Sequence, residues 1–341
     1  MKTRIVRFER HGGPEVLKIF HEEKKQPKEL EVAIKIIAFG VNQGEVMYRE
    51  GRYVSHPNFP ARLGSEGSGI IESLGSNEQE WKIGDEVTII PFLSYDKNGY
   101  WTSDSSNKYG TYGDTAIVPS WTISKKQHNQ SFEESSSIWA QYLTAWGGLV
   151  HDVNINKRKF CIFTGASSNA AIGGMQIVKY FGLKALAISR TLNKKNELKK
   201  IGYDEVLALD DPNLEEQIMD YTNGIGFDLA YDCVGGEHFT KLINAAKPQA
   251  LIVNYGNLNL NASKIKTLPL LSKRIHIRFH SIFDTMRFED QRKQGIEWIN
   301  NKIEKGILRP VIAKIFDLEN IVDAHKYLES AKHIGKVVVK T

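Results

Sequence analysis

The spacing of apolar and polar residues changes along the chain, most clearly between residues 160 and 182. Four β-favouring residues, Phe160 to Phe163, lead into a turn of very small residues. Beyond the turn, apolar residues recur at helical spacing, at Ile172, Met175, Val178 and Phe181. This pattern predicts a strand, a tight turn and an amphipathic helix, which is the form of a phosphate-binding βα unit.

The small-residue turn departs from the strict dinucleotide-binding fingerprint. Where that fingerprint has three spaced glycines, this chain has Gly165, Ser168 and Ala171. Glycine-poor turns of this kind also join strands to helices in parallel sheets that bind nothing. The turn alone therefore does not distinguish a coenzyme site from an ordinary connection between a strand and a helix, and the residues elsewhere in the chain provide the further evidence.

The alternation of strand and helix continues as far as residue 279. Strands are predicted at 160–164, 185–189, 205–208, 228–232, 250–254 and 275–279, and helices at 170–182, 193–201, 213–222 and 237–246. Strands that alternate with helices of about ten residues form a parallel, doubly wound sheet, and six strands fit the complete dinucleotide-binding form.

The two ends of the chain have a different pattern. Residues 1–124 contain many short strands separated by Gly, Pro and Asn, which predicts a compact, partly open β-barrel. The polar, aperiodic stretch at 95–109 is predicted to be an exposed loop. From about residue 286, a long helix at 290–305 precedes a pair of strands near 309–316, a short helix at 319–329 and a last strand at 336–339. These strands have no helical partners in the alternating pattern, and we expect them to complete the sheet of the first domain. The predicted domains are 1–124, 125–285 and a return at 286–341.

The composition narrows the possible functions. Among the 341 residues, 45 are basic and 40 acidic, and this small excess suits a phosphate-bearing ligand. Without a long basic run, it does not indicate a nucleic-acid surface. No segment reaches 18 consecutive apolar residues and the N-terminus lacks a signal-peptide run, so we expect a cytoplasmic protein with no membrane anchor. Cys161 and Cys233 lie in apolar runs and are expected to be core residues.

Basic residues follow the second strand of the alternating region. A site selective for NAD places an acidic residue here, which binds the ribose 2′-hydroxyl and would repel a 2′-phosphate. This chain has Ser189 and Arg190, with Lys194 and Lys195 a turn later. A guanidinium can bind phosphate in a bidentate manner, although basic residues on a loop can also be simply solvated. The position predicts NADPH as the cofactor.

Several further motifs occur in a fixed order along nearly the whole chain. They are FERHGGPEVL at 8–17, VNQGE at 41–45 with GRY at 51–53, GSEGSG at 64–69, LTAW at 143–146, DCVGG at 232–236, and GILRP at 306–310 with HIGK at 333–336. Together they resemble the medium-chain dehydrogenase/reductase superfamily, in its zinc-independent quinone oxidoreductase branch. The resemblance implies an α/β protein with a GroES-like catalytic domain and a Rossmann domain. It also implies a homodimer that joins through the edge strand at 274–279.

Zinc-dependent alcohol dehydrogenases of this superfamily have metal ligands that this chain lacks. Their histidine position is Ser65 here, and their two catalytic cysteine positions fall near Asn42 and Ala140. Their structural zinc loop corresponds to 95–109, which has no cysteine. Zinc requires three or four N, S or O ligands around one centre, so we expect no metal. The expected reaction is therefore hydride transfer from NADPH to a small-molecule quinone or an activated alkene or carbonyl acceptor.

The resemblance also suggests roles for individual residues. Tyr53 corresponds to a proposed proton donor or oxyanion partner, Asn42 could polarise a carbonyl, and Thr144 resembles a threonine that meets the nicotinamide. Each also has a structural interpretation, as a pocket-lining aromatic for Tyr53 and as a helix hydroxyl bonded to backbone for Thr144. The expected cofactor-binding residues are Ser167, Ser168, Asn169, Ala170, Ala171, Ser189, Arg190, Lys194, Cys233, Val234, Tyr255, Gly256, Phe279, His280 and Ser281.

Two alternatives to quinone reduction stay open at this stage. One is a 2-enoyl thioester or alkenal reductase, which needs a proton at carbon and would therefore depend on Tyr53. The other is a protein without catalytic activity that binds NADPH in a structural or redox-sensing role. The degenerate turn at residues 165–171 keeps the second alternative open.

Overall fold

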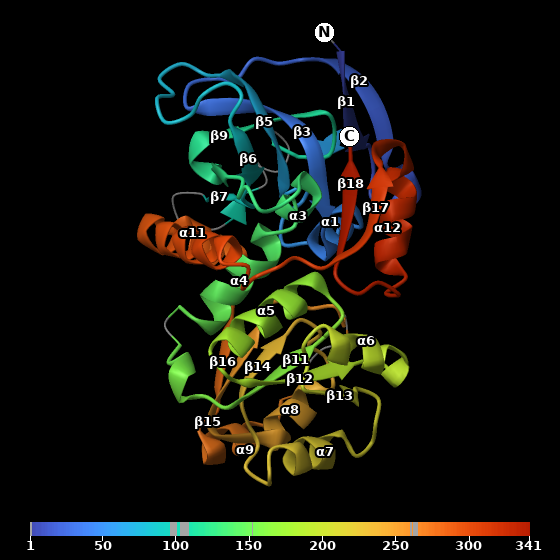
Figure 1. The fold of residues 1–341 in the computed structure, drawn as a ribbon. Coiled ribbons are helices and arrows are strands. Elements are labelled where there is room, and N and C mark those ends of the chain that lie inside the picture. Colours follow the sequence, from blue (N-terminus) through green and yellow to red (C-terminus); the bar gives the residue numbers. More distant parts are fainter. Residues whose placement is uncertain (1, 96–100, 103–108, 152, 260, 262–264) are drawn as a thin grey trace. The chain divides into compact units, whose positions relative to one another are not determined.

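The computed structural model describes residues 2–95, 101–102, 109–151, 153–259, 261 and 265–341. The chain separates into two units, residues 1–140 with 309–341 and residues 141–308. Figure 1 shows the elements of each. Among the described residues, no helix combines the length and the apolar content that crossing a membrane requires.

The first unit is built from β-sheets. A three-stranded sheet has the order β2 (Lys18–Glu23), β1 (Lys2–Phe8), β4 (Ala61–Arg62). The larger sheet has the order β10 (Ile123–Lys125), β6 (Glu86–Ile89), β5 (Gly67–Leu74), β3 (Glu31–Val41), β18 (Lys336–Lys340), β17 (Ile312–Asp317), with β9 (Thr115–Pro119) also on β3. Its helices are α1 (Gln43–Arg49), α3 (Phe132–Ser135) and α12 (Ile321–Glu329), with 3₁₀ turns at Pro14–Val16, Ser120–Thr122 and Leu318–Asn320. This is the GroES-like arrangement predicted.

Strand β3 is the centre of this unit because it pairs with β5, β9 and β18. Val32, Ile34 and Ile36 alternate along it and face the core, where each is at most 1% exposed. Burying an aliphatic side chain of this size is worth roughly 1.5–3 kcal/mol. The core therefore fixes the register of β3 and, with it, the start of α1, which follows β3 directly.

The C-terminal strands join the sheet of the first unit. β18 pairs antiparallel with β3, and β17 pairs parallel with β18. The units divide the chain at 140/141 and 308/309, whereas the predicted boundaries were 124/125 and 285/286. The segment around α3 stays with the first unit, where the Ser68 hydroxyl donates to Phe132 O at 2.6 Å. Helix α11 (Glu289–Glu304) stays with the second, because Gly295 packs against Leu143 and Trp146.

The second unit contains the parallel sheet. Its order is β13 (Glu205–Ala208), β12 (Lys184–Ser189), β11 (Phe160–Thr164), β14 (Phe227–Asp232), β15 (Ala246–Asn254), β16 (His276–Phe279), and every pairing is parallel. Its helices are α4 (Trp139–Leu149), which begins in the first unit, α5 (Asn169–Tyr180), α6 (Lys195–Lys200), α7 (Leu214–Tyr221), α8 (Phe239–Ala245), α9 (Thr267–Lys273) and α10 (Ile282–Arg287), besides α11. The 3₁₀ turns are Ile155–Lys157 and Leu192–Lys194. The order confirms the predicted six-stranded Rossmann sheet.

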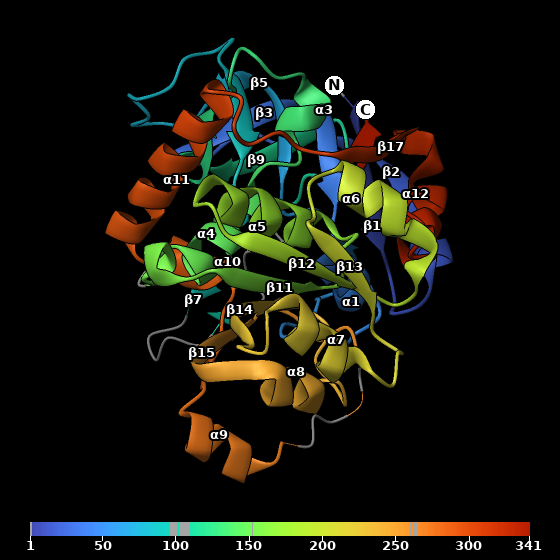
Figure 2. The same cartoon turned by 60° about the horizontal axis from the view of Figure 1, so that its bottom comes forward.

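Helices cover both faces of this sheet. Figure 2 shows α5 and α6 on one face and α7 and α8 on the other. Central strand β14 is therefore buried along its whole length, from Phe227 to Asp232. A parallel strand covered on both faces is expected to be apolar throughout, so Asp228 and Asp232 within it require buried partners.

Several elements differ from those predicted. Helices α9 and α10 were not expected, because neither shows an apolar stripe at helical spacing. β15 begins at Ala246 and not at residue 250, so α8 ends earlier than predicted. The predicted pair of strands near 309–316 is the single strand β17. At the predicted exposed loop, 95–109, two short strands pair: β7 (Ser94–Tyr95), which begins one residue before the loop, and β8 (Trp101–Thr102). Residues 96–100 and 103–108 lie outside the described part.

Candidate functional site

The turn between β11 and α5 is closed by contacts that only small residues permit. Gly165 adopts φ +57°, and a Cβ there would lie 2.7 Å from Cys233 Sγ. Ser168 caps α5, with its hydroxyl accepting a hydrogen bond from Ala171 N at 3.3 Å. The serine at the second fingerprint position therefore satisfies one N–H of the first helical turn itself. Ala171 is fully buried, so its methyl group lies within the fold.

The start of α5 nevertheless has the properties of an anion site. Ser167, Ser168, Asn169 and Ala170 are half-buried, and the Oδ1 atom of Asn169 is buried without a hydrogen-bond partner. The N-terminus of a 12-residue helix carries unpaired N–H groups and a partial positive charge. These residues fit a pyrophosphate, and a polar ligand would satisfy the Asn169 amide.

The basic residues after β12 fall into two groups. Arg190 is exposed beyond the buried Ser189, and Lys194 Nζ donates to Ser167 Oγ at 3.1 Å. Burial and the nearby Arg190 lower the pKa of Lys194. Lys194 therefore lies beside the α5 turn, and Arg190 lies near enough to Lys194 to lower its pKa, at the end of β12 where a 2′-phosphate is expected.

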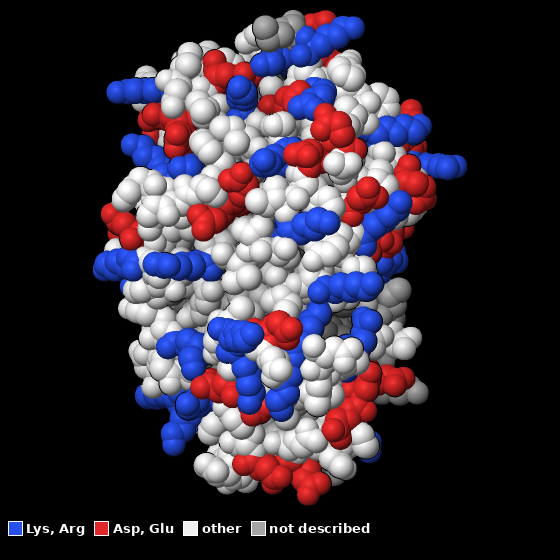
Figure 3. Space-filling view, turned by 45° about the vertical axis from the view of Figure 1, so that its right-hand side comes forward, with Lys and Arg blue, Asp and Glu red and all other residues white. Residues whose placement is uncertain are grey.

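Lys195 belongs to the other group, because it pairs with Glu205 at 2.9 Å, as Lys199 does at 2.7 Å. Burial opposes ionisation of Glu205, but the hydrogen bonds from these lysines lower its pKa to about 2. Figure 3, in which the right-hand side of Figure 1 comes forward, shows basic and acidic side chains interspersed on the surface of the second unit. Among the predicted phosphate ligands, Lys195 is thus neutralised by a carboxylate.

The loop after β14 is held by a residue that sequence reasoning missed. Asp232, fully buried, accepts hydrogen bonds from Val234 N at 3.3 Å and Gly235 N at 3.1 Å. Burial would raise its pKa, but contacts from His238, Thr164 and Asn254 lower it. Asp232 thereby shapes the turn that contains Cys233 and Val234. Its signal in the sequence was an acidic residue at the end of a mostly apolar strand.

The ends of the fifth and sixth strands lie beside this loop. Tyr255 stacks on Tyr231 with ring centroids 3.8 Å apart, and a Cβ on Gly256 would lie 3.1 Å from Cys233 O. Burial and the Asp232 carboxylate raise the pKa of the Cys233 thiol to about 12, so this cysteine is not a thiolate nucleophile. Both predicted residues therefore pack against the β14 turn.

His280 and Thr144 meet within the second unit. Gly147, one turn after Thr144 on α4, packs on the imidazole so closely that a Cβ would lie 2.7 Å from His280 Cε1. Burial, together with Arg278, lowers the pKa of His280 to about 4, so the ring is neutral near pH 7. Its Nε2 atom is buried without a partner. A neutral imidazole with an open nitrogen can contact a ligand but cannot act as a proton donor from the charged form.

Two other residues of the predicted cofactor set have different surroundings. Ser281 caps α10, accepting from Phe283 N at 3.3 Å. Its own N–H donates to Asp284 at 2.8 Å. The Phe279 side chain lies on edge strand β16 and is 76% exposed.

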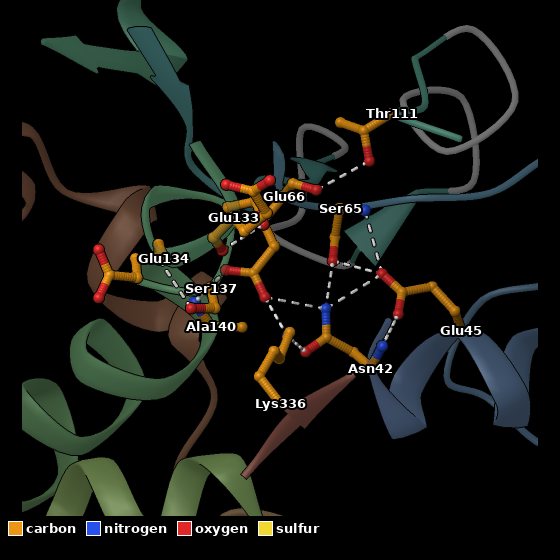
Figure 4. A network of polar contacts seen from close by, with 11 residues as sticks. Asn42, Glu45, Ser65, Glu66, Thr111, Glu133, Glu134, Ser137, Ala140 and Lys336 are labelled. Atoms are coloured by element: carbon orange, nitrogen blue, oxygen red, sulfur yellow. Dashed lines mark hydrogen bonds and ion pairs between the residues drawn. The ribbon is translucent and has the colours of Figure 1, made fainter. Parts of the chain in front are cut away.

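In the first unit, Asn42 lies within a polar network that Figure 4 shows. It is the N-cap of α1, and its Nδ2 donates to Glu66 Oε1 at 3.2 Å and to Ser65 Oγ at 3.3 Å. Its Oδ1 accepts from Lys336. Both ends of the amide are therefore engaged inside the protein, which favours a positioning role over direct polarisation of a carbonyl.

The three positions that hold catalytic zinc ligands in related dehydrogenases come together in this network. Glu66 joins them, because it accepts from Asn42 Nδ2 and, at 2.9 Å, from Ala140 N, while Ser65 contacts Asn42. Lys336, 1% exposed, pairs with Glu66. Within the described part of the chain, no group of three or more His, Cys, Asp or Glu residues is arranged to hold a metal.

Tyr53 lies just after α1 and packs on the core of the first unit. Its ring contacts Tyr48 edge-on at 6.4 Å and lies against Gly44. Burial, with the nearby Glu45 carboxylate, raises the pKa of Tyr53 above its usual value. The phenol therefore keeps its proton over the whole physiological range. Among the described residues, none makes a hydrogen bond to its hydroxyl.

Comparisons with known proteins agree with this architecture. The family model of the alcohol dehydrogenase GroES-like domain matches residues 28–128, and that of the zinc-binding dehydrogenases matches 201–339. Human quinone oxidoreductase is 27% identical over 98% of this chain and 97% of its own length. A solved NAD-dependent alcohol dehydrogenase is 26% identical, with a TM-score of 0.89 over 99% of both chains.

A second solved structure has the same fold. It is Escherichia coli quinone oxidoreductase complexed with NADPH, 22% identical, with a TM-score of 0.88 over 99% of this chain and 100% of that one. The two family models cover the barrel and most of the dinucleotide-binding and C-terminal segments, and the relatives match end to end. The chain belongs to the medium-chain dehydrogenase/reductase superfamily, and quinone oxidoreductases are among its relatives.

Proposed function

We propose that this protein is an NADPH-dependent oxidoreductase that transfers hydride, without zinc, to a quinone or to an activated alkene or carbonyl. The observation that carries the proposal is the placement of Arg190 and Lys194 beside the α5 turn. Lys194 contacts Ser167 at 3.1 Å, so a cation lies directly beside the predicted pyrophosphate residues. A site of this kind suits a coenzyme with an additional phosphate.

The residues of the second unit would bind the coenzyme, which supplies the hydride when bound. The start of α5, from Ser167 to Ala171, would hold the pyrophosphate, and Arg190 with Lys194 the 2′-phosphate. The β14 turn at Cys233 and Val234, followed by Tyr255 and Gly256, would line the adenosine side. Thr144 and the open Nε2 of His280 would face the nicotinamide, with Phe279 and Ser281 flanking His280. Of these, Ser281 supports the site through its helix cap.

Residues of the first unit would serve the acceptor. Tyr53, whose hydroxyl is protonated and uncommitted to any described residue, would donate a hydrogen bond to a carbonyl or enolate oxygen. The Asn42 network would hold the start of α1 in place. A hydride acceptor that becomes an anion needs such a donor, which supports enones and enoyl thioesters as acceptors besides quinones.

The names of the relatives support the class of reaction. Two of them are quinone oxidoreductases, one complexed with NADPH, and one is an NAD-dependent alcohol dehydrogenase. Ser65, Asn42 and Ala140 occupy the ligand positions of the metal-dependent enzymes, so alcohol oxidation would lack the zinc that stabilises the alkoxide. These relatives differ in their coenzyme, which is NAD for one and NADPH for another. Arg190 and Lys194 favour NADPH for this chain.

The direct test is a set of initial-rate assays with purified protein. The rate of NADPH or NADH oxidation is measured with each of a panel of small quinones, enones and 2-enoyl thioesters. The measurements are repeated after the protein has been dialysed against a chelator. We expect turnover with NADPH, unaffected by the chelator and weaker with NADH. No turnover with any acceptor would overturn the proposal. Tight NADPH binding without turnover would instead favour the structural or redox-sensing alternative.

We further propose that the protein is a cytoplasmic homodimer. Strand β16 lies at one edge of the six-stranded sheet, and neighbouring apolar residues of α9 are strongly exposed: Leu268 is 73% exposed and Leu271 76%. Exposed edges and apolar patches of this kind favour association with a second copy. Both cysteines are free and buried, which suits a reducing compartment, and fractionation of cells would test the location.

A further inference from the structure

Glu45 and Ser65 form a short hydrogen-bonded pair in the first unit. Ser65 Oγ lies 2.6 Å from Glu45 Oε1, and Ser65 N donates to the same oxygen at 3.0 Å. Glu45 is 6% exposed, whereas Ser65 is half-buried. Figure 4 shows the pair beside Asn42. The Ser65 hydroxyl donates to an ionised Glu45, whereas a protonated Glu45 can donate to Ser65 Oγ over the same distance. Of the two residues, Ser65 is the more exposed.

The charges around the pair favour a proton on Glu45. Two buried carboxylates, Glu45 and Glu66, lie near the buried ammonium of Lys336, which forms its ion pair with Glu66. Lys336 binds Glu66 and Asn42, while the contacts of Glu45 come from Asn42 and Ser65. An unbalanced negative charge in the interior is costly, so the carboxyl without a cation becomes neutral first. Consistent with this, burial raises the pKa of Glu45.

We propose that Glu45 and Ser65 form a proton relay that protonates the reduced acceptor, an inference that rests on the proposed function. Hydride adds to the β-carbon of an enone, and the alkene electron pair moves to the carbonyl oxygen. The Ser65 hydroxyl then gives its proton to this enolate while the Glu45 carboxyl passes its own proton to Ser65 Oγ. The Glu45 carboxylate left behind recovers a proton from water through the hydroxyl of Ser65, the less buried residue of the pair. Each turnover thus consumes one hydride and one solvent proton.

The relay complements Tyr53 because the two residues do different work. Burial raises the pKa of Tyr53, an ionised Glu45 would raise it further, and a phenol with a raised pKa holds its proton firmly. Tyr53 therefore orients the acceptor through a hydrogen bond, and the proton itself comes from Glu45. Besides burial, the groups that act on the pKa of Glu45 are Lys336 on β18, which lowers it, and Glu66 before β5, which raises it. The hydrogen bonds from Ser65 and Asn42 lower this pKa as well. Tyr53 and Tyr112 are the other titratable neighbours, and Glu45 raises the pKa of both.

The test compares four single variants in the full-length protein. Glu45→Gln and Ser65→Ala remove the relay, Ser65→Thr keeps the hydroxyl, and Glu31→Gln is the control. Glu31 is also a carboxylate at 6% exposure in the first unit, where it accepts from Tyr109 and lies outside the network. NADPH affinity and circular dichroism establish that each variant is folded and binds coenzyme.

We expect Glu45→Gln and Ser65→Ala to lower kcat for an enone by about 100-fold, the lower end of general acid catalysis. Quinone reduction should change little, because a hydroquinone anion takes its proton from water. The wild type should show a pH dependence of kcat and a solvent deuterium isotope effect, and both variants should lose them. Ser65→Thr and Glu31→Gln should keep both. The double variant should be no slower than either single one, because both residues act in one path.

The failures of the two proposals are distinguishable. If the wild type reduces no acceptor, the proposed function itself is wrong. If the wild type reduces enones and both relay variants keep its rate, pH profile and isotope effect, the relay is wrong. If Glu45→Gln does not fold, the relay is tested by comparing Ser65→Ala with Ser65→Thr. Ser65 is only half-buried, so its substitution disturbs the fold less than that of Glu45. An equal loss with enones and quinones would also contradict the relay, because it would indicate a structural role.

Discussion

The hydroxyl of Thr164 donates a hydrogen bond of 2.5 Å to Asp232, and the two residues end adjacent parallel strands of the dinucleotide-binding sheet. Asn254, at the end of the next strand, donates to the same carboxylate at 2.8 Å. One fully buried side chain therefore ties together the carboxyl ends of β11, β14 and β15. Ligands of doubly wound sheets bind beyond these ends, so Asp232 supports the coenzyme pocket from beneath.

Replacing Asp232 by Asn should therefore weaken both the fold and coenzyme binding. The change places an NH₂ group among donors and leaves at least one buried donor unpaired, which costs about 1–3 kcal/mol. We expect a loss of about that size in the free energy of unfolding, measured in urea, and at least a tenfold rise in the Kd for NADPH, measured by fluorescence. Asp220→Asn, on the exposed side of α7, should change neither. An unchanged Kd would show that the strand ends are held without Asp232.

Coenzyme selectivity should depend on Arg190 and Lys194 and not on Lys195. Each charge-assisted contact to a phosphate contributes about 1.5–3 kcal/mol to the binding free energy. Arg190 is exposed, so its contribution is expected at the lower end of this range. Arg190→Ala and Lys194→Met should each raise the Kd for NADPH by about tenfold and leave that for NADH nearly unchanged. Lys195→Met is the matched control, because Lys195 is already paired with Glu205. Equal effects on both coenzymes would contradict a 2′-phosphate role.

The sequence predicted the parallel sheet well because its strands are buried on both faces. β14 is apolar over most of its length, and β11 ends at a small-residue turn, so both strands stand out from the polar helices around them. The boundaries of the units were harder to predict. They depend on which unit α3 and α11 pack against. Ser131 marks the start of α3 and Gly295 lies within α11, but neither residue indicates in the sequence which segment its helix contacts.

The candidate site was predictable only where a residue's neighbours lie close in the sequence. The α5 turn and Arg190 follow their strands directly. Glu45 and Lys336 belong to one buried network but are almost 300 residues apart, and each alone resembles an ordinary surface charge. Lys336 stands at the start of an apolar strand, and this position is the sequence signal of its burial.

Tyr53→Phe should separate the two kinds of acceptor. Loss of one hydrogen-bond donor to a developing oxyanion costs about 10²–10³ in kcat, so enone reduction should fall by that order while quinone reduction changes little. The raised pKa of Tyr53 adds a pH prediction: wild-type kcat should show no decline from tyrosine ionisation up to pH 10. A decline near pH 9, absent from Tyr53→Phe, would show that the phenol ionises more easily than its burial implies.

Acid should destabilise the first unit through His325. Its ring is fully buried between Arg49, 2.9 Å from Nδ1, and Tyr112, 3.2 Å from Nε2. Burial, with the Arg49 charge, lowers the pKa of His325 to about 3. Between about pH 6.5 and 3 the unfolded chain binds a proton that the folded chain does not, so stability falls as pH falls, by about 1.4 kcal/mol per pH unit.

His325→Gln tests this directly, because glutamine cannot take up the proton. Urea unfolding at pH 7 and pH 5 should show a smaller loss of stability on acidification in the variant than in the wild type. At pH 7 the variant should be less stable by about 1–3 kcal/mol, since the contacts to Arg49 and Tyr112 are weakened. His128→Gln, at an exposed position, should keep the wild-type dependence. A variant with the wild-type slope would assign the acid sensitivity to other groups.

Dimer formation should depend on the apolar residues beside edge strand β16. Leu271 on α9 is 76% exposed, and a charge there would have to be desolvated in any interface that covers the patch. We expect light scattering at micromolar concentration to give about twice the chain mass of 38.6 kDa for the wild type and the monomer mass for Leu271→Glu. Ile225→Glu, at a residue of the same unit that is 55% exposed, should remain dimeric. A monomeric wild type would refute the proposed dimer, and a dimeric Leu271→Glu would place its interface on another surface.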